Sequence, residues 1–139
     1  MPIRNAVLAA MQILSQEFVI GRNFKDINKM SGLEKEVFSF DMLGEAARTP
    51  QQADDYFESY KSAIDEVGKI NTARNLSNGV SIKISALHPR YEMRKINQVE
   101  SELLPKLEEL VNYAQSKDVE ITIDAEEQDR LSLSLHIIE

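Results

Sequence analysis

Residues 80–87 read VSIKISAL, and this stretch decides the fold class. Apolar side chains occupy every second position, whereas Ser81, Lys83 and Ser85 lie between them. Alternation with a period of two is typical of a β-strand that has one apolar face. We therefore predict a strand over residues 80–87, followed by a loop with the sequence HPRY at residues 88–91.

A helical pattern lies on each side of this strand. Before it, Thr49, Pro50 and Gln52 supply an N-cap, a proline at the first helical position and a capping-box partner, and apolar residues then recur every three or four positions. After it, the same spacing extends over residues 99–114. Pro105 predicts a kink there or the start of a fresh helix, because proline lacks a backbone N–H.

Two further strands are predicted beyond these helices. Residues 37–43 (VFSFDML) alternate bulky with smaller or polar side chains before Gly44, and residues 119–125 alternate apolar with polar ones. A last helical pattern begins near Glu127. Strands that alternate with helices predict parallel pairing, because each helix returns the chain to the starting edge of the sheet. The sequence therefore predicts an α/β protein.

The strands predicted at residues 80–87 and 119–125 keep one face polar. In a doubly wound sheet, helices cover both faces and the strands read as apolar runs. A polar face instead suits a barrel, whose helices cover only the outside. We predict an incomplete (β/α)8 TIM-like barrel with the first three βα units, since a whole barrel needs about 250 residues. The expected division is a helical lead-in segment at residues 1–36 and a partial barrel, truncated at its C-terminal end, at residues 37–139.

Apolar residues also recur at helical spacing near the N-terminus, at Val7, Met11, Leu14 and Phe18. The polar residues Gln12 and Ser15 interrupt the apolar run too early for a signal peptide. We therefore predict an amphipathic helix that packs on a core.

Composition excludes several classes of function. The net charge is -7 and the basic residues are scattered, so we expect no contact with nucleic acid. The chain has no cysteine, which excludes disulfides and thiolate metal sites. His88 and His136 share no metal-ligand spacing, so we expect no metal site. No G-x-G-x-x-G fingerprint is present, and any flavin must be bound by another architecture.

The candidate site residues lie at or just beyond the carboxyl ends of the predicted strands, where barrels bind their ligands. Lys83 is either a cation inside the barrel, paired with an anionic group, or a strand lysine that faces solvent. Asp124 is either a carboxylate that faces Lys83 across neighbouring strands or a helix N-cap. Glu45 is either a carboxylate that gates the site or an ordinary residue of a first helical turn.

Three segments around these residues resemble the signature blocks of the first three barrel strands in one enzyme family. They are MLGEAA at residues 42–47, SIKISALHPRY at residues 81–91 and IDAEEQDRLSLSL at residues 123–135. The family is the proline dehydrogenase domain of the bacterial bifunctional proline-utilisation flavoenzymes, which combine proline dehydrogenase with glutamate semialdehyde dehydrogenase. The blocks follow the same order at similar spacing, and the PIR at residues 2–4 resembles the segment before the barrel. The resemblance thus covers essentially the whole chain.

This resemblance implies part of an FAD-dependent proline dehydrogenase, which oxidises L-proline to 1-pyrroline-5-carboxylate by hydride transfer to the flavin, in the catabolism of proline to glutamate. It implies that Lys83 helps to bind the substrate carboxylate and that Asp124 belongs to the active site and to the cofactor site. Ala125 would lie near the isoalloxazine ring, and Glu45 would pair with a late arginine to close a gate. A membrane quinone would accept the electrons, and the complete enzyme would be cytoplasmic, with peripheral contact to the inner membrane as an option.

The same resemblance implies that the arginines that clamp the carboxylate, and most residues that contact the flavin, belong to later strands and helices. We therefore expect the isolated chain to be inactive. A second hypothesis is a non-catalytic half-barrel that docks onto a complementary chain, namely the missing half of the barrel. A third is an unrelated carboxylate-binding barrel, which the three signature blocks argue against.

Overall fold

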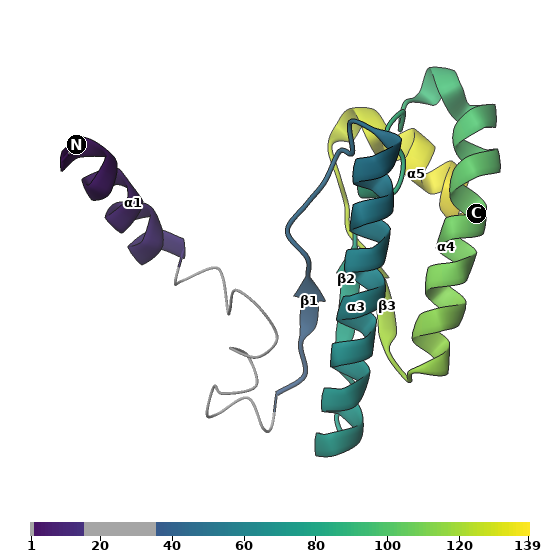
Figure 1. Ribbon diagram of the computed structural model, residues 1–139. Helices are drawn as coiled ribbons and strands as arrows, with labels where there is room; N and C mark the ends of the chain where they lie inside the picture. Colours follow the sequence, from purple (N-terminus) through teal and green to yellow (C-terminus); the bar gives the residue numbers. More distant parts are fainter. Residues whose placement is uncertain (1, 16–35) are drawn as a thin grey trace. The chain divides into compact units, whose positions relative to one another are not determined.

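A computed structural model describes residues 2–15 and 36–139 of the chain (Figure 1). The chain divides into two units, residues 1–33 and 34–139, which are described separately. The first unit contains helix α1 (Pro2–Ser15), which confirms the predicted helix. Phe18 of the predicted pattern lies outside the described residues, and the packing of this helix on a core stays a prediction.

The second unit contains a parallel sheet with the strand order β1-β2-β3. Its strands are β1 (Ser39–Asp41), β2 (Gly79–Ile82) and β3 (Glu120–Ile123). The register aligns Asp41 with Ser81 and Ser81 with Thr122. Parallel strands connected by helices confirm the predicted α/β class.

Two long helices cover one face of this sheet. Helix α3 (Pro50–Arg74) packs against β2, helix α4 (Ile96–Ser116) packs against β3, and the two helices pack against each other (Figure 1). Helix α5 (Leu131–Ile138) follows and contacts α4. Short 3-10 turns complete the unit at η2 (Ile84–Ala86), η3 (Met93–Lys95) and η4 (Gln128–Arg130).

The hydrophobic core lies between the sheet and these helices. Val80 and Ile82 of the central strand are fully buried, whereas Ile121 and Ile123 of β3 are only half-buried. The helices contribute apolar side chains at three- and four-residue spacing, namely Tyr60, Ile64, Val67, Leu103, Leu107 and Leu110. Full burial of one such side chain contributes about 1.5 to 3 kcal/mol, so this layer dominates the stability of the unit.

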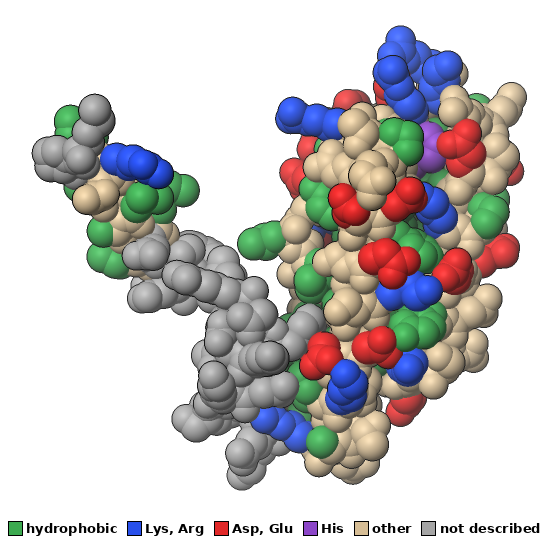
Figure 2. Space-filling view, in the orientation of Figure 1, with side chains coloured by type: hydrophobic (Ala, Val, Ile, Leu, Met, Phe, Trp, Pro, Cys, Tyr) green, Lys and Arg blue, Asp and Glu red, His purple; other side chains and the backbone are tan. Residues whose placement is uncertain are grey.

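Charged side chains of both signs are interspersed over the outer surface of α3 and α4 (Figure 2). Two ion pairs cross between the helices, Lys61 to Glu109 at 2.9 Å and Lys106 to Asp54 at 2.7 Å. Such exposed pairs contribute little to stability, typically below about 1 kcal/mol. They orient the two helices more than they stabilise them.

Helix α3 begins where the sequence predicts. The hydroxyl of Thr49 accepts a hydrogen bond from the backbone N–H of Gln52 at 3.1 Å. The Gln52 side chain in turn accepts from the backbone N–H of Arg48 at 2.9 Å, one residue earlier than in a standard capping box. Asn75 ends the helix in the left-handed conformation, with φ 53°.

The strands predicted over residues 37–43, 80–87 and 119–125 extend too far, because β1, β2 and β3 end at Asp41, Ile82 and Ile123. Beyond Ile82, the N–H groups of Ala86 and Leu87 bond to the carbonyls of Lys83 and Ile84 in a 3-10 turn, and those of Lys83 and Ser85 bond to side chains. The N–H of Lys83 donates to the Tyr60 hydroxyl at 3.0 Å, and that of Ser85 to a carboxylate oxygen of Glu126 at 2.9 Å. Of the two alternatives predicted at Pro105, a fresh helix is wrong, because α4 continues through this exposed position, where water can bind the unpaired carbonyl. The kink stays a prediction.

A buried pair of asparagines connects the beginnings of the strands. The Asn71 side-chain oxygen accepts from both the backbone and the side-chain N–H of Asn78, each at 2.8 Å. The Asn71 amide donates to the carbonyls of Asn78 and Asp118 at 2.9 and 3.2 Å. The Asn78 side chain also accepts from the N–H of Phe38 at 2.8 Å. One amide pair therefore joins α3 to the segments that enter all of the strands.

Replacing Asn71 by leucine should lower the free energy of unfolding by about 2 to 4 kcal/mol, because buried donors of Asn78 lose their acceptor. Urea unfolding of the purified chain, followed by circular dichroism, measures this change. Thr72→Leu, at the adjacent exposed position, is the matched control and should change stability by less than about 0.5 kcal/mol. Equal effects of the two substitutions would show that the asparagine pair is not a structural connection.

Candidate functional site

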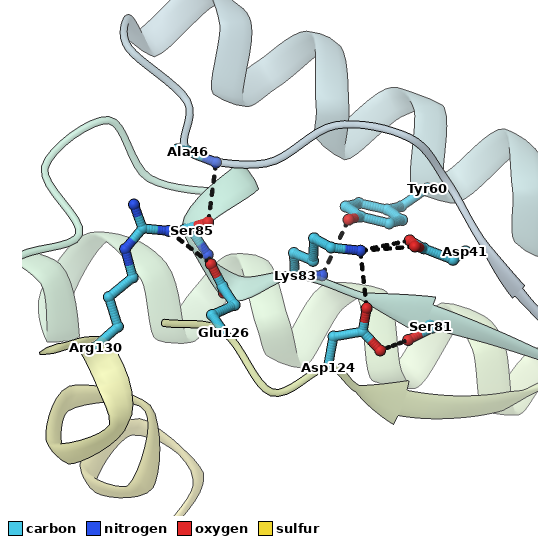
Figure 3. A network of polar contacts seen from close by, with 9 residues as sticks. All are labelled: Asp41, Ala46, Tyr60, Ser81, Lys83, Ser85, Asp124, Glu126 and Arg130. Carbon is cyan, nitrogen blue, oxygen red and sulfur yellow. Dashed lines mark hydrogen bonds and ion pairs between the residues drawn. The ribbon is translucent and has the colours of Figure 1, made fainter. Parts of the chain in front are cut away.

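A lysine and two aspartates meet at the carboxyl ends of the strands (Figure 3). The ammonium nitrogen of Lys83 lies 2.8 Å from both carboxylate oxygens of Asp41 and 2.8 Å from Oδ2 of Asp124. The other oxygen of Asp124 accepts a hydrogen bond from the hydroxyl of Ser81. Each strand thus contributes a polar side chain to one cluster, which we call the Lys83 cluster: Asp41, Ser81, Lys83 and Asp124.

The parallel register explains why these groups meet. Asp41, Ser81 and Thr122 are aligned across the sheet and share one face, opposite the buried Val80 and Ile82. Lys83 and Asp124 each follow two positions after an aligned residue and continue on that face. The cluster therefore lies on the side of the sheet away from α3 and α4.

Burial and hydrogen bonding act in opposite directions on the charges of the cluster. Burial works to lower the pKa of Lys83, but the hydrogen bonds to Asp124 and Asp41 outweigh it and raise the pKa above the ordinary lysine value. Burial works to raise the pKa of Asp124, whereas the hydrogen bonds from Lys83 and Ser81 lower it below the ordinary value. Lys83 and Asp124 are therefore both charged at neutral pH.

Tyr60 connects the cluster to the core. Tyr60 belongs to α3, and its side chain is almost fully buried. Its hydroxyl accepts a hydrogen bond from the backbone N–H of Lys83. Burial raises the pKa of Tyr60, so the hydroxyl stays neutral beside the charged groups. The Lys83 backbone is thus fixed by a rigid aromatic side chain, which limits the positions that the ammonium group can reach.

A second polar network lies next to the cluster and shapes the loops at this edge of the sheet. The nearly buried Glu126 accepts from the Ser85 N–H at 2.9 Å and from the Arg130 guanidinium at 2.8 Å. The Ser85 hydroxyl accepts from the backbone N–H of Ala46, and the Ser85 carbonyl accepts from that of Ala47, both at 2.9 Å. This network positions the loop after β1 on the turn after β2.

The structure brings together two of the predicted site residues, Lys83 and Asp124, in direct contact. Glu45 is exposed in the loop after β1 and makes no ion pair with the cations among residues 36–139 that are described. Its gating role stays a prediction. Ala125 is exposed just beyond β3, and its place near a flavin ring stays a prediction.

Sequence reasoning missed Asp41 and Ser81 as members of the cluster. A signal for Asp41 exists, since it ends a strand whose other residues are apolar or small. Ser81 lies on the predicted polar face, but nothing in the sequence indicates its hydrogen bond to Asp124. Among the described residues, no group of three histidine, cysteine or carboxylate side chains could bind a metal ion.

Comparison with known proteins identifies close relatives. Residues 24–139 match the proline dehydrogenase family. The bifunctional protein PutA of Escherichia coli is 42% identical over 142 residues, which covers 99% of this chain and 11% of the relative. The chain thus spans a small part of that protein. Within the described part of the chain, no helix is long and apolar enough to cross a membrane.

Solved structures agree with this assignment. A crystal structure of proline utilization A (PutA) from Bradyrhizobium japonicum matches with a TM-score of 0.71 at 43% identity, over 85% of this chain and 12% of that one. A PutA structure from Bdellovibrio bacteriovorus matches with a TM-score of 0.85 over 98% of this chain and 16% of that one, but at 19% identity, and so supports the fold alone.

Replacing Lys83 by methionine should destabilise the chain by about 1 to 3 kcal/mol at neutral pH, because two carboxylates lose their cation. The difference from wild type should shrink as the pH falls from about 5 to about 3. The pKa of Asp124 is lowered on folding, so its stabilisation is present above the unfolded pKa and is lost as the pH falls toward the folded one.

Urea unfolding at several pH values measures this difference. Lys69→Met removes an exposed lysine that pairs with Glu66, and serves as the control with a change below about 0.5 kcal/mol. A Lys83→Met difference that stays constant down to the lowest pH would mean that Asp124 gains no stability from Lys83.

Proposed function

The chain belongs to the proline dehydrogenase family, and on this premise we propose that it forms the first three strand–helix units of an FAD-dependent (β/α)8 barrel that oxidises L-proline to 1-pyrroline-5-carboxylate. The observation that carries the proposal is Lys83, a largely buried cation at the carboxyl edge of the parallel sheet. In barrels of this class the ligand lies at that edge. We further propose that residues 1–36 are a lead-in segment and residues 37–139 the barrel part.

In this proposal Lys83 binds the carboxylate of proline. Its ammonium group is charged at neutral pH, and its backbone is fixed by Tyr60, so it offers a cation at a defined position. Because the lysine is already positioned, its own side chain loses little conformational entropy when the substrate binds. Asp124 keeps Lys83 charged and directs it, since it contacts the ammonium group at 2.8 Å.

The residues at the end of β3 are compatible with a flavin. Ala125 is small and exposed beside Asp124, and within residues 36–139 the helices α3 and α4 pack on the opposite, apolar face of the sheet. The flavin would supply the acceptor for the hydride from C5 of proline, and the C5=N bond of the product would form as the proline nitrogen gives up a proton to solvent. The role of this chain is to hold the substrate carboxylate while Asp124 and Ala125 border the ring.

The remaining partners follow from the same proposal. Glu45 would pair with an arginine from a later strand and close the site over bound proline. A membrane quinone would reoxidise the flavin, in a cytoplasmic enzyme that contacts the inner membrane at its periphery. The later strands of the barrel would cover the edges of β1 and β3, which are the outer strands of the described sheet.

In a complete flavin-containing barrel that includes this chain, Lys83→Ala should weaken proline binding by about ten- to a hundredfold, as expected for loss of a charge-assisted contact. Flavin content should stay unchanged. Steady-state kinetics with proline and the flavin absorbance of the purified protein measure the two effects. Lys69→Ala, on the exposed side of α3, is the control. Unchanged kcat and KM in Lys83→Ala would remove Lys83 from the substrate site.

The 139-residue chain, purified by itself, should neither retain FAD nor reduce a dye with proline. In a closed barrel, strands beyond the three described here would pair with the outer edges of β1 and β3 and would help to enclose the site. Adding the later strands as a separate chain should restore activity if the two parts reassemble. Flavin absorbance and proline-dependent dye reduction are the measurements. A yellow, active preparation of the chain alone would contradict this expectation.

A further inference from the structure

The two carboxylates that contact Lys83 are held to different degrees. The Asp124 side chain is 32% exposed and bonds to Ser81 as well as to Lys83, and its backbone N–H donates to the carbonyl of Ile82 at 2.9 Å. The Asp41 side chain is 45% exposed. Among the described residues, Lys83 is the one side-chain partner of its carboxylate.

Lys83 itself has little freedom. Its side chain is 15% exposed, and its backbone is bonded to the buried Tyr60. An ammonium group has three N–H donors, and three carboxylate oxygens lie 2.8 Å from this one. A new anion can therefore bind Lys83 only when an aspartate oxygen leaves. Asp41 is the one that can leave at the lower cost, because its carboxylate is the more exposed of the two and has no second side-chain partner among the described residues.

We propose that Asp41 is the exchangeable counter-ion of Lys83, and that the carboxylate of a small amino or imino acid takes its place while Asp124 stays bound. The identity of that ligand as L-proline rests on the proposed function. The exchange keeps two carboxylates on Lys83, so the buried cation remains compensated throughout. Asp41 is thus a positioning residue that determines when Lys83 is available.

The same exchange selects among ligands. The displaced carboxylate remains near the bound ligand, where it attracts an ammonium group and repels a ligand that is only anionic. A zwitterion such as proline therefore binds with the help of Asp41. Cyclopentanecarboxylate has the ring and the carboxylate but no amine, so the charge of Asp41 weakens its binding. Removing the charge of Asp41 should therefore strengthen the binding of cyclopentanecarboxylate but not that of proline.

Acylation of the lysines by acetic anhydride, quantified by peptide mass spectrometry of the 139-residue chain, tests this proposal. Lys69, whose side chain is 70% exposed, gives the reference rate in the same sample. We expect Lys83 to react at least about tenfold more slowly than Lys69, since its amine is paired and largely buried. Added cyclopentanecarboxylate should protect Lys83 in Asp41→Asn at a concentration about three- to tenfold lower than in wild type, the range between an exposed ion pair and a charge-assisted hydrogen bond.

Glu120→Gln is the matched control, because it removes one carboxylate from an exposed position of β3 and should behave as wild type. Equal protecting concentrations in Asp41→Asn and wild type would overturn the proposal, as would a wild-type Lys83 that reacts as fast as Lys69.

Asp41→Ser is the second variant. If both substitutions abolish the helical circular dichroism, Asp41 maintains the fold instead of exchanging, and the proposal is wrong. Protection by cyclopentanecarboxylate but not by L-proline would leave the exchange intact and contradict the proposed substrate.

Discussion

The register of the parallel sheet is the constraint on which the site depends. A shift of one residue would turn Ser81 and Thr122 toward the helices and separate Asp41 from Lys83. The buried pair of Asn71 and Asn78 fixes this register from the opposite end of the strands, by bonding to the segments that enter them. A structural feature far from the ligand edge thus determines which charges meet there.

Alternation within single strands was sufficient to predict the class of fold and the face that carries Lys83 and Asp124. Each residue was predicted with two open roles, and the structure shows the two side chains in contact. Asp41 was not predicted, because its strand has three residues and its pairing depends on a residue 42 positions later. Short strands carry too little periodicity to indicate which face an isolated polar residue occupies.

The error in the predicted end of β2 also comes from contacts between residues far apart in the sequence. The end of β2 is determined by Tyr60 and Glu126, which accept the backbone N–H groups of Lys83 and Ser85. These acceptors lie 23 and 41 positions from their donors in the sequence, so the residue pattern around the strand does not predict these hydrogen bonds. Ile84 is buried in a 3-10 turn, but it continues the apolar alternation of the strand. The sequence pattern therefore predicts a strand where the structure has a turn. Tertiary hydrogen bonds, and not propensity, end this strand.

The charge of the Lys83 cluster limits what these residues can do by themselves. One ammonium and two carboxylates give a formal charge of minus one, so the cluster as a whole does not attract anions. In the proposed function, Lys83 would therefore orient a carboxylate more than it would supply an excess of positive charge. A site that binds a carboxylate tightly needs further cations, and the exposed polar face beside Asp41 is where groups from outside the described sheet can supply them. The geometry of these strands thus accounts for orientation, whereas affinity must come from residues that complete the edge.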